Sequence, residues 1–118
     1  MSALARLTEE RQGGVPIAIL DGEVDAANAV HLGDGIRALL SNDDTLLVID
    51  PSRVGYIDSA GLNMLFTLAD ELRERQQELR LVVPEDAPIA RTLEITGLGG
   101  TIRTEGDRRS ALREASAG

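Results

Sequence analysis

Two hydrophobic periods alternate along the 118-residue chain. Short apolar runs predict β-strands, and longer stretches with apolar residues three or four positions apart predict amphipathic helices. The predicted strands are 4–10, 15–20, 45–49, 79–83 and 101–104, and the predicted helices are 26–41, 59–77, one capped by Asp86 and one that runs from its cap at Asp107 to residue 115. The predicted order is therefore β-β-α-β-α-β-α-β-α, with about four helices.

This order defines an α/β fold with a mixed, mostly parallel sheet. Strands that alternate with helices form parallel pairs through right-handed crossovers, and the glycines at 13 and 14 predict a hairpin between the first two strands. The run Leu46–Ile49 has no polar alternation, which is typical of a central strand that is buried on both faces.

The polar segment 21–25 is predicted to be a loop. The segment 50–53 is predicted to be a turn, because Pro51 disfavours a direct continuation of the third strand into a helix. Each segment follows a predicted strand. In parallel α/β sheets the functional surface usually lies at the carboxyl ends of the strands. We therefore expect that surface to hold Asp21 to Asp25 and Asp50 to Gly61.

Charge and composition exclude several classes of function. The net charge of −8 disfavours binding to nucleic acid and favours a basic partner surface. The chain has no cysteine and no lysine, since all twelve basic residues are arginine, so thiol chemistry and a catalytic lysine are excluded. No secretory signal or membrane-spanning run is visible, and we expect a soluble, cytoplasmic protein.

Few residues offer other chemistry. Asp58 and Ser59 stand where the long helix begins, and both are common helix caps. Asp25 is also a candidate cap, for the first helix. A metal site at Asp21 and Asp50 is a weak alternative, since no dedicated ligand spacing is present. A serine hydrolase would depend on His31, the only histidine, and Ser59 lacks the Gly-x-Ser-x-Gly motif. We therefore predict no enzyme activity, no cofactor and no metal.

Three segments, taken with the order of elements, resemble the STAS family, and within it the bacterial anti-sigma-factor antagonists. They are Gly22-Glu23-Val24-Asp25, Asp58-Ser59-Ala60-Gly61-Leu62 and Thr96-Gly97-Leu98. The resemblance covers about residues 4–115. It predicts a single STAS domain over 1–118, in which 116–118 form a flexible tail.

The resemblance implies a regulatory binding protein that acts in transcription and stress response. Its partner would be an anti-sigma factor that is itself a serine kinase, and its binding would release a sigma factor. Phosphorylation of Ser59 would end that interaction, and a phosphatase would restore it. The predicted partner-binding residues are Asp25, Asp58, Ser59, Gly61 and Met64. The predicted oligomeric state is a monomer or a weak dimer.

Elementary electrostatics is compatible with such a switch. A helix N-terminus accommodates phosphate, and a phosphoserine adds about −1.5 to −2 charges beside Asp58. We expect disruption of an interface rather than a rearrangement of the fold. Gly61 either keeps the helix start narrow for a kinase or permits close helix packing. Two alternatives stay open, namely a STAS scaffold subunit of a transport or stress-signalling complex without phosphorylation, and a sensor of small ligands.

Overall fold

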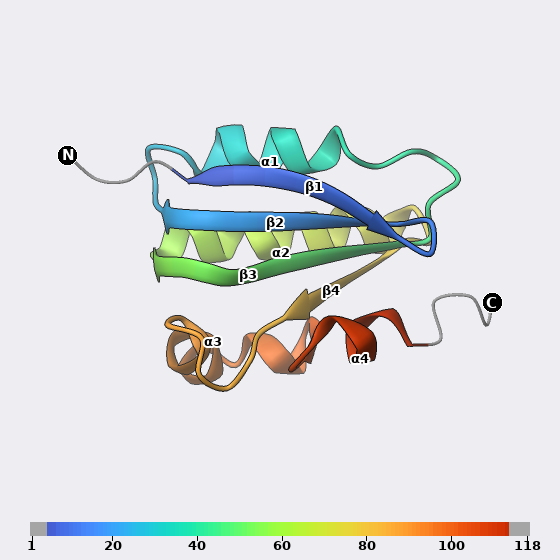
Figure 1. Cartoon of the computed structure of the whole chain (residues 1–118). Coiled ribbons are helices and arrows are strands. Elements are labelled where there is room, and N and C mark those ends of the chain that lie inside the picture. Colours follow the sequence, from blue (N-terminus) through green and yellow to red (C-terminus); the bar gives the residue numbers. More distant parts are fainter. Residues whose placement is uncertain (1–4, 114–118) are drawn as a thin grey trace.

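Residues 5–113 are described by the computed structural model, in which five strands form one sheet (Figure 1). The elements are β1 (Arg6–Gln12), β2 (Val15–Val24), α1 (Ala29–Arg37), β3 (Leu46–Ile57), α2 (Ser59–Glu74), β4 (Glu78–Val82), α3 (Ala90–Thr96), the 3₁₀ helix η1 (Leu98–Gly100), β5 (Arg103–Glu105) and α4 (Arg108–Leu112). The predicted fold class and order of strands and helices are confirmed, with η1 as an addition. The extent of the domain, 1–118, stays a prediction, and the predictions for residue 4 and for residues 114–118 lie outside the described residues.

The strands lie side by side in the order in which they occur in the chain, β1-β2-β3-β4-β5. β1 and β2 are antiparallel, and each later pair is parallel. The predicted hairpin turns at Gly13 and Gly14, whose φ angles of 60° and 83° glycine adopts without the steric cost that a side chain adds. The mixed, mostly parallel sheet is thus the predicted one.

The two faces of the sheet are covered unequally. The helices α1, α2 and α3 contribute to one large core, in which Leu47 and Ile49 of β3 meet Leu65 of α2, all fully buried. The opposite face carries a smaller cluster that includes Ile17 of β2 and Ala111 of α4. Leu46–Ile49 are between 0 and 4% exposed, so the prediction of a central strand that is buried on both faces is confirmed.

Two strands are longer than predicted, because β-bulges carry them through polar segments. The predicted loop 21–25 is wrong, since β2 continues to Val24, and the predicted turn 50–53 is wrong, since β3 continues to Ile57. Ile19 pairs with Asp50 and Asp21 pairs with Arg53, so one residue of β2 opposes two residues of β3. Pro51 lies in this irregularity, where a strand tolerates a residue without an N–H group.

Several helix ends also differ from the predictions. α1 begins at Ala29 rather than at residue 26 and ends at Arg37, and its N-cap is Asn28 rather than Asp25. α2 ends at Glu74 rather than at residue 77, since Gln76 takes a positive φ of 57° before β4.

The two C-terminal helices differ in their caps. The predicted cap of the third helix is wrong, because α3 begins at Ala90 after Ile89 and has no side-chain cap from Asp86. The predicted cap of the last helix is confirmed, because the Asp107 side chain accepts a hydrogen bond from the Ser110 N–H. Among residues 5–113, no helix is both long enough and apolar enough to cross a membrane.

Candidate functional site at the carboxyl edge of the sheet

The carboxyl ends of β2 and β3 lie side by side, which brings together two segments that are far apart in the chain. Val24 pairs with Ile57 in the parallel register. The Asp58 N–H continues this pairing by donating to the Val24 carbonyl oxygen at 3.2 Å. Asp25 and Asp58 therefore follow neighbouring strand ends at one edge of the sheet, where α2 begins. We call the surface formed by residues 23–28 and 58–61 the switch edge.

The beginning of α2 is capped by Asp58 and not by Ser59. Asp58 is the N-cap, and its Oδ1 accepts from the N–H groups of Ala60 at 2.9 Å and Gly61 at 3.2 Å. Ser59 is the first helical residue and is exposed. Within residues 5–113 its hydroxyl makes no hydrogen bond. The capping role that the sequence left open for Ser59 therefore belongs to Asp58 alone.

Asp25 shapes the turn before α1. Its Oδ1 accepts from the Ala27 N–H at 3.0 Å, and its carbonyl oxygen accepts from Ala29 at 2.8 Å. Asn28 locks the same turn, because its side chain donates to the Glu23 carbonyl oxygen at 2.8 Å and accepts from the Asp25 N–H at 3.1 Å. Asn28 is a positioning residue that sequence reasoning missed, although an asparagine three residues after an aspartate is a typical turn signal.

Gly61 lies where α2 packs most closely on the strand ends. A Cβ atom at this position would come within 2.5 Å of the Ile57 side chain and 2.8 Å of the Val24 side chain. Any larger residue would push α2 away from the switch edge. Of the two roles that the sequence left open for Gly61, the contacts favour helix packing, and its role in partner binding stays a prediction.

Met64 lies one turn further along α2 and is mostly buried, with 7% of its surface exposed. It belongs to the main core and also lines a shallow cleft between α1 and α2, which has a volume of about 220 Å³. A partner could therefore reach Met64 only through this cleft, and its role in binding stays a prediction.

Other candidate residues lie outside the switch edge as defined. Asp50 is 7% exposed, and its carboxylate accepts from the Ser52 hydroxyl at 2.6 Å and from Arg108 Nε at 3.1 Å. Asp21 is exposed on β2, and His31 is exposed on α1. No group of three or more His, Cys, Asp or Glu residues in the described part of the chain is arranged to hold a metal ion.

The ion pair between Arg108 and Asp50 ties α4 to the sheet. Arg108 also donates to Glu10 of β1 at 3.0 Å. Partial burial disfavours the charge of Arg108, but the hydrogen bonds to Asp50 and Glu10 outweigh this effect and raise the pKa of Arg108. These charges hold the fold together rather than offering a reactive group.

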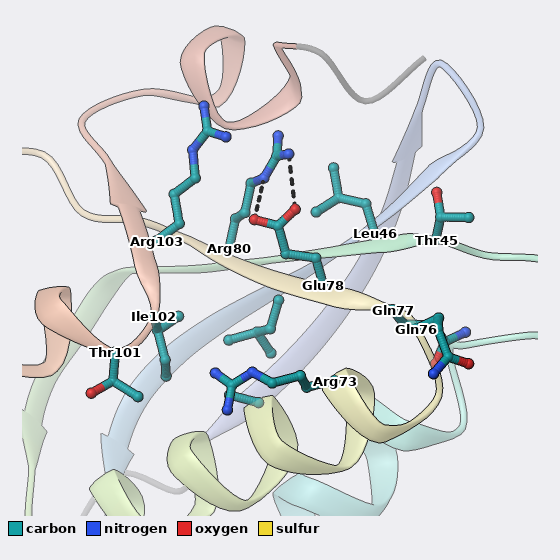
Figure 2. Close-up of a pocket in the computed structure, with 12 residues that line it drawn as sticks. Thr45, Leu46, Arg73, Gln76, Gln77, Glu78, Arg80, Thr101, Ile102 and Arg103 are labelled. Carbon is teal, nitrogen blue, oxygen red and sulfur yellow. Dashed lines mark hydrogen bonds and ion pairs between the residues drawn. The ribbon is translucent and has the colours of Figure 1, made fainter. Parts of the chain in front are cut away.

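A cavity of about 560 Å³ opens at the amino ends of β3 and β4, opposite the switch edge (Figure 2). The buried Arg80 points from β4 toward α4 and donates to the carbonyl oxygens of Ala111 at 2.8 Å and Arg113 at 2.9 Å. Its Nε and Nη2 atoms donate to the Glu78 carboxylate, at 3.0 Å each. Its guanidinium is therefore committed to holding α4.

Comparisons with known proteins agree with this architecture. The family model described as "Mlab, STAS domain" matches residues 7–104. The chain therefore belongs to the STAS domain family.

Three similar proteins show how far the likeness extends. BtrV of Bordetella bronchiseptica is 38% identical over 76 residues, which cover 64% of this chain and 66% of that protein. The anti-sigma-B factor antagonist of Listeria monocytogenes is 36% identical over 81 residues, which cover 69% of this chain and 70% of that protein. The crystal structure of an anti-sigma factor antagonist from Mycobacterium paratuberculosis has a TM-score of 0.83 and 27% identity, and it covers 98% of this chain and 99% of that chain.

Proposed function

We propose that this protein is a cytoplasmic anti-sigma factor antagonist that binds an anti-sigma factor through the switch edge and is inactivated by phosphorylation of Ser59. The bound partner would be the kinase, and a phosphatase would restore the active form. The observation that carries the proposal is the state of Ser59, which is exposed at the start of α2 and whose hydroxyl bonds to no residue among 5–113, while Asp58 caps the helix. All three similar proteins described above are named as anti-sigma factor antagonists.

The position of Ser59 suits phosphoryl transfer from a partner. The Ser59 Oγ would attack the γ-phosphorus of ATP bound to the kinase, ADP would leave, and the hydroxyl proton would pass to a base of the kinase. No hydrogen bond to another described residue has to break first. The first turn of α2 contains no acidic residue, so the carboxylate of the N-cap Asp58 is the acidic group that faces the positive end of the helix dipole there.

The same geometry suggests how a phosphate would act. The N–H groups of Ala60 and Gly61, which could otherwise bind an anion, already donate to Asp58. A phosphate on Ser59 would therefore project outward beside the Asp58 carboxylate. It would add about −1.5 to −2 charges to the surface that the partner contacts. We expect the fold to persist while the interface becomes repulsive.

Intact-mass analysis tests the proposal directly. The protein is incubated with ATP and with each candidate anti-sigma factor of its source organism, beside Ser59→Ala and Ser110→Ala variants. We expect the wild type and Ser110→Ala to gain one phosphoryl group and Ser59→Ala to gain none. Stable binding without any gain of mass would refute the switch and support the scaffold alternative. No binding to any anti-sigma factor would refute the proposed function as a whole.

A further inference from the structure

The cleft between α1 and α2 is lined mainly by apolar and uncharged residues. Its floor is formed by Ala29, Gly33 and the buried Met64, and its rim includes Val30, which is 76% exposed. Gly33 helps to keep it open, since a Cβ atom there would lie 3.1 Å from the Met64 Cγ. The volume of about 220 Å³ suits one large side chain rather than a separate small-molecule ligand.

The cleft is continuous with the switch edge. Figure 1 shows that α1 and α2 begin at the same edge of the sheet and run in the same direction. Asn63 and Thr67, which line the cleft, follow Ser59 at intervals of four residues and so lie on the same side of α2. Four residues of helix span about 6 Å, so an interface of ordinary size, about 800 Å² on each partner, would cover Ser59 and the cleft together.

The far end of the cleft is closed by an ion-pair cluster. Arg37 reaches from α1 to both carboxylate oxygens of Glu71 on α2, at 2.6 and 3.0 Å, and donates to Asp34 at 3.0 Å. Because these two carboxylates engage Arg37, the cluster is negative overall. The side chains of Asp34 and Glu71 are 68% and 41% exposed, so both carboxylates are accessible from solvent.

These observations define the chemistry of the occupant. An apolar floor favours an apolar side chain, and the exposed acidic groups at the closed end, Asp34 and Glu71, favour a basic neighbour there. A second copy of this chain fits poorly, since both copies would carry a net charge of −8. A basic partner segment therefore fits the cleft better than a homodimer does.

We propose that the cleft receives one apolar side chain of the anti-sigma factor, with a Lys or Arg neighbour that faces Asp34 and Glu71, and that Val30 forms the wall against which the apolar side chain packs. This inference rests on the proposed function and adds the location of an apolar anchor, about one helical turn from the phosphorylation site. Such anchors at the centre of an interface carry a large share of binding energy.

Matched substitutions at two exposed apolar residues test this inference. Val30→Ser removes the proposed wall, and Ile95→Ser is the control, because Ile95 is 73% exposed on α3. Calorimetry with the anti-sigma factor measures the affinity, and thermal unfolding confirms that each variant is folded. We expect Val30→Ser to raise Kd about tenfold and Ile95→Ser to leave Kd within twofold. A second variant, Thr67→Phe, should fill the cleft from its exposed rim and weaken binding by a similar factor.

The outcomes separate this inference from the proposed function. If the wild type binds, Ser59→Asp does not, and both cleft variants bind like the wild type, the cleft proposal is wrong and the switch survives. If the wild type binds no anti-sigma factor, the proposed function fails first. Sedimentation of the free protein adds a further test, because a dimer that Val30→Ser dissociates would assign the cleft to a second copy of the chain and overturn the inference.

Discussion

Two helices of this protein, α2 and α4, begin with the same kind of N-cap, but the residue that follows the cap makes different contacts in each helix. In each, an aspartate in extended conformation caps the helix, and its Oδ1 accepts hydrogen bonds from first-turn N–H groups. In α4 the residue after the cap is Arg108, which reaches across the sheet to Asp50 and Glu10. In α2 the residue after the cap is Ser59, which is exposed and whose hydroxyl bonds to no described residue.

The difference follows from what each helix needs. α4 has five residues, too few to be stable alone, and it depends on Arg108 at its start and on Arg80 at its last carbonyl groups. α2 has sixteen residues and a buried stripe that includes Leu65, Leu68 and Leu72, so its packing stabilises it without help from residue 59. The first position of α2 can therefore change chemically without loss of the helix.

Adding charge at the two helix starts should separate binding from folding, and this is the largest effect we expect. Ser59→Asp should weaken binding to the anti-sigma factor about a hundredfold, or ~3 kcal/mol, because a second carboxylate beside Asp58 adds negative charge to the surface that the partner contacts. Ser110→Asp in the first turn of α4 is the control and should leave the affinity unchanged. Both can be measured by calorimetry, with Tm recorded for each variant.

A fall in the Tm of Ser59→Asp would mean that Ser59 contributes to the stability of α2, and that the buried stripe of α2 does not stabilise the helix without help from residue 59. Equal affinity of Ser59→Asp and the wild type would contradict the proposed switch instead. The two readouts therefore test the two parts of the argument separately.

Removing Arg108 from the start of α4 should lower the free energy of unfolding by less than Ser59→Asp lowers the free energy of binding. Arg108→Gln leaves the carboxylate of Asp50, whose side chain is 9% exposed, with Ser52 as its remaining hydrogen-bond partner. We expect the free energy of unfolding to fall by about 2 kcal/mol in urea denaturation, because breaking one side of a largely buried pair is costly. The loss should shrink as salt is raised from 0.1 to 1 M.

The pair between Arg73 and Asp70 offers a matched control for this experiment. Both of its side chains are more than 60% exposed, and its Nη1–Oδ1 distance is 3.2 Å. Arg73→Gln should therefore change stability by less than about 0.5 kcal/mol. Similar losses for the two variants would show that α4 is not held by Arg108.

Local sequence patterns were sufficient for the order of elements but not for the ends of the strands that form the site. The polar residues of 21–25 and the proline at 51 favour a loop and a turn when each segment is read alone. In the structure the two segments pair with each other, Asp21 with Arg53 and Val24 with Ile57, and bulges absorb the irregular residues. Pairing between segments about thirty residues apart outweighs local preference, and no window of sequence contains that information.

The candidate site was predicted only in part, because some of its contacts also depend on the three-dimensional structure and not on local sequence. The run Asp58-Ser59-Ala60-Gly61 showed a helix start and, by resemblance, a phosphorylation site, but the sequence could not say which of the first two residues caps the helix. Backbone geometry decides this, because Asp58 is extended at φ −104° and its carboxylate reaches the first-turn N–H groups. The link between Arg108 and Glu10 joins residues 98 positions apart and has no sequence signal at all.

The weakest expected effect concerns the cap of α4 in acid. The hydrogen bond from the Ser110 N–H lowers the pKa of Asp107 below its ordinary value of 3.8. A carboxyl group whose pKa is lower in the folded state contributes stability that is fully present above the unfolded value and is lost as pH falls through the folded value. The Tm difference between the wild type and Asp107→Ala should thus be small but constant from pH 7 to about pH 5, and should vanish well below pH 3.8. A Tm difference that persists unchanged well below pH 3.8 would mean that the capping hydrogen bond does not depend on the charge of Asp107. The absence of a difference at every pH would mean that Asp107 does not stabilise α4, which would then be held by Arg108 and Arg80.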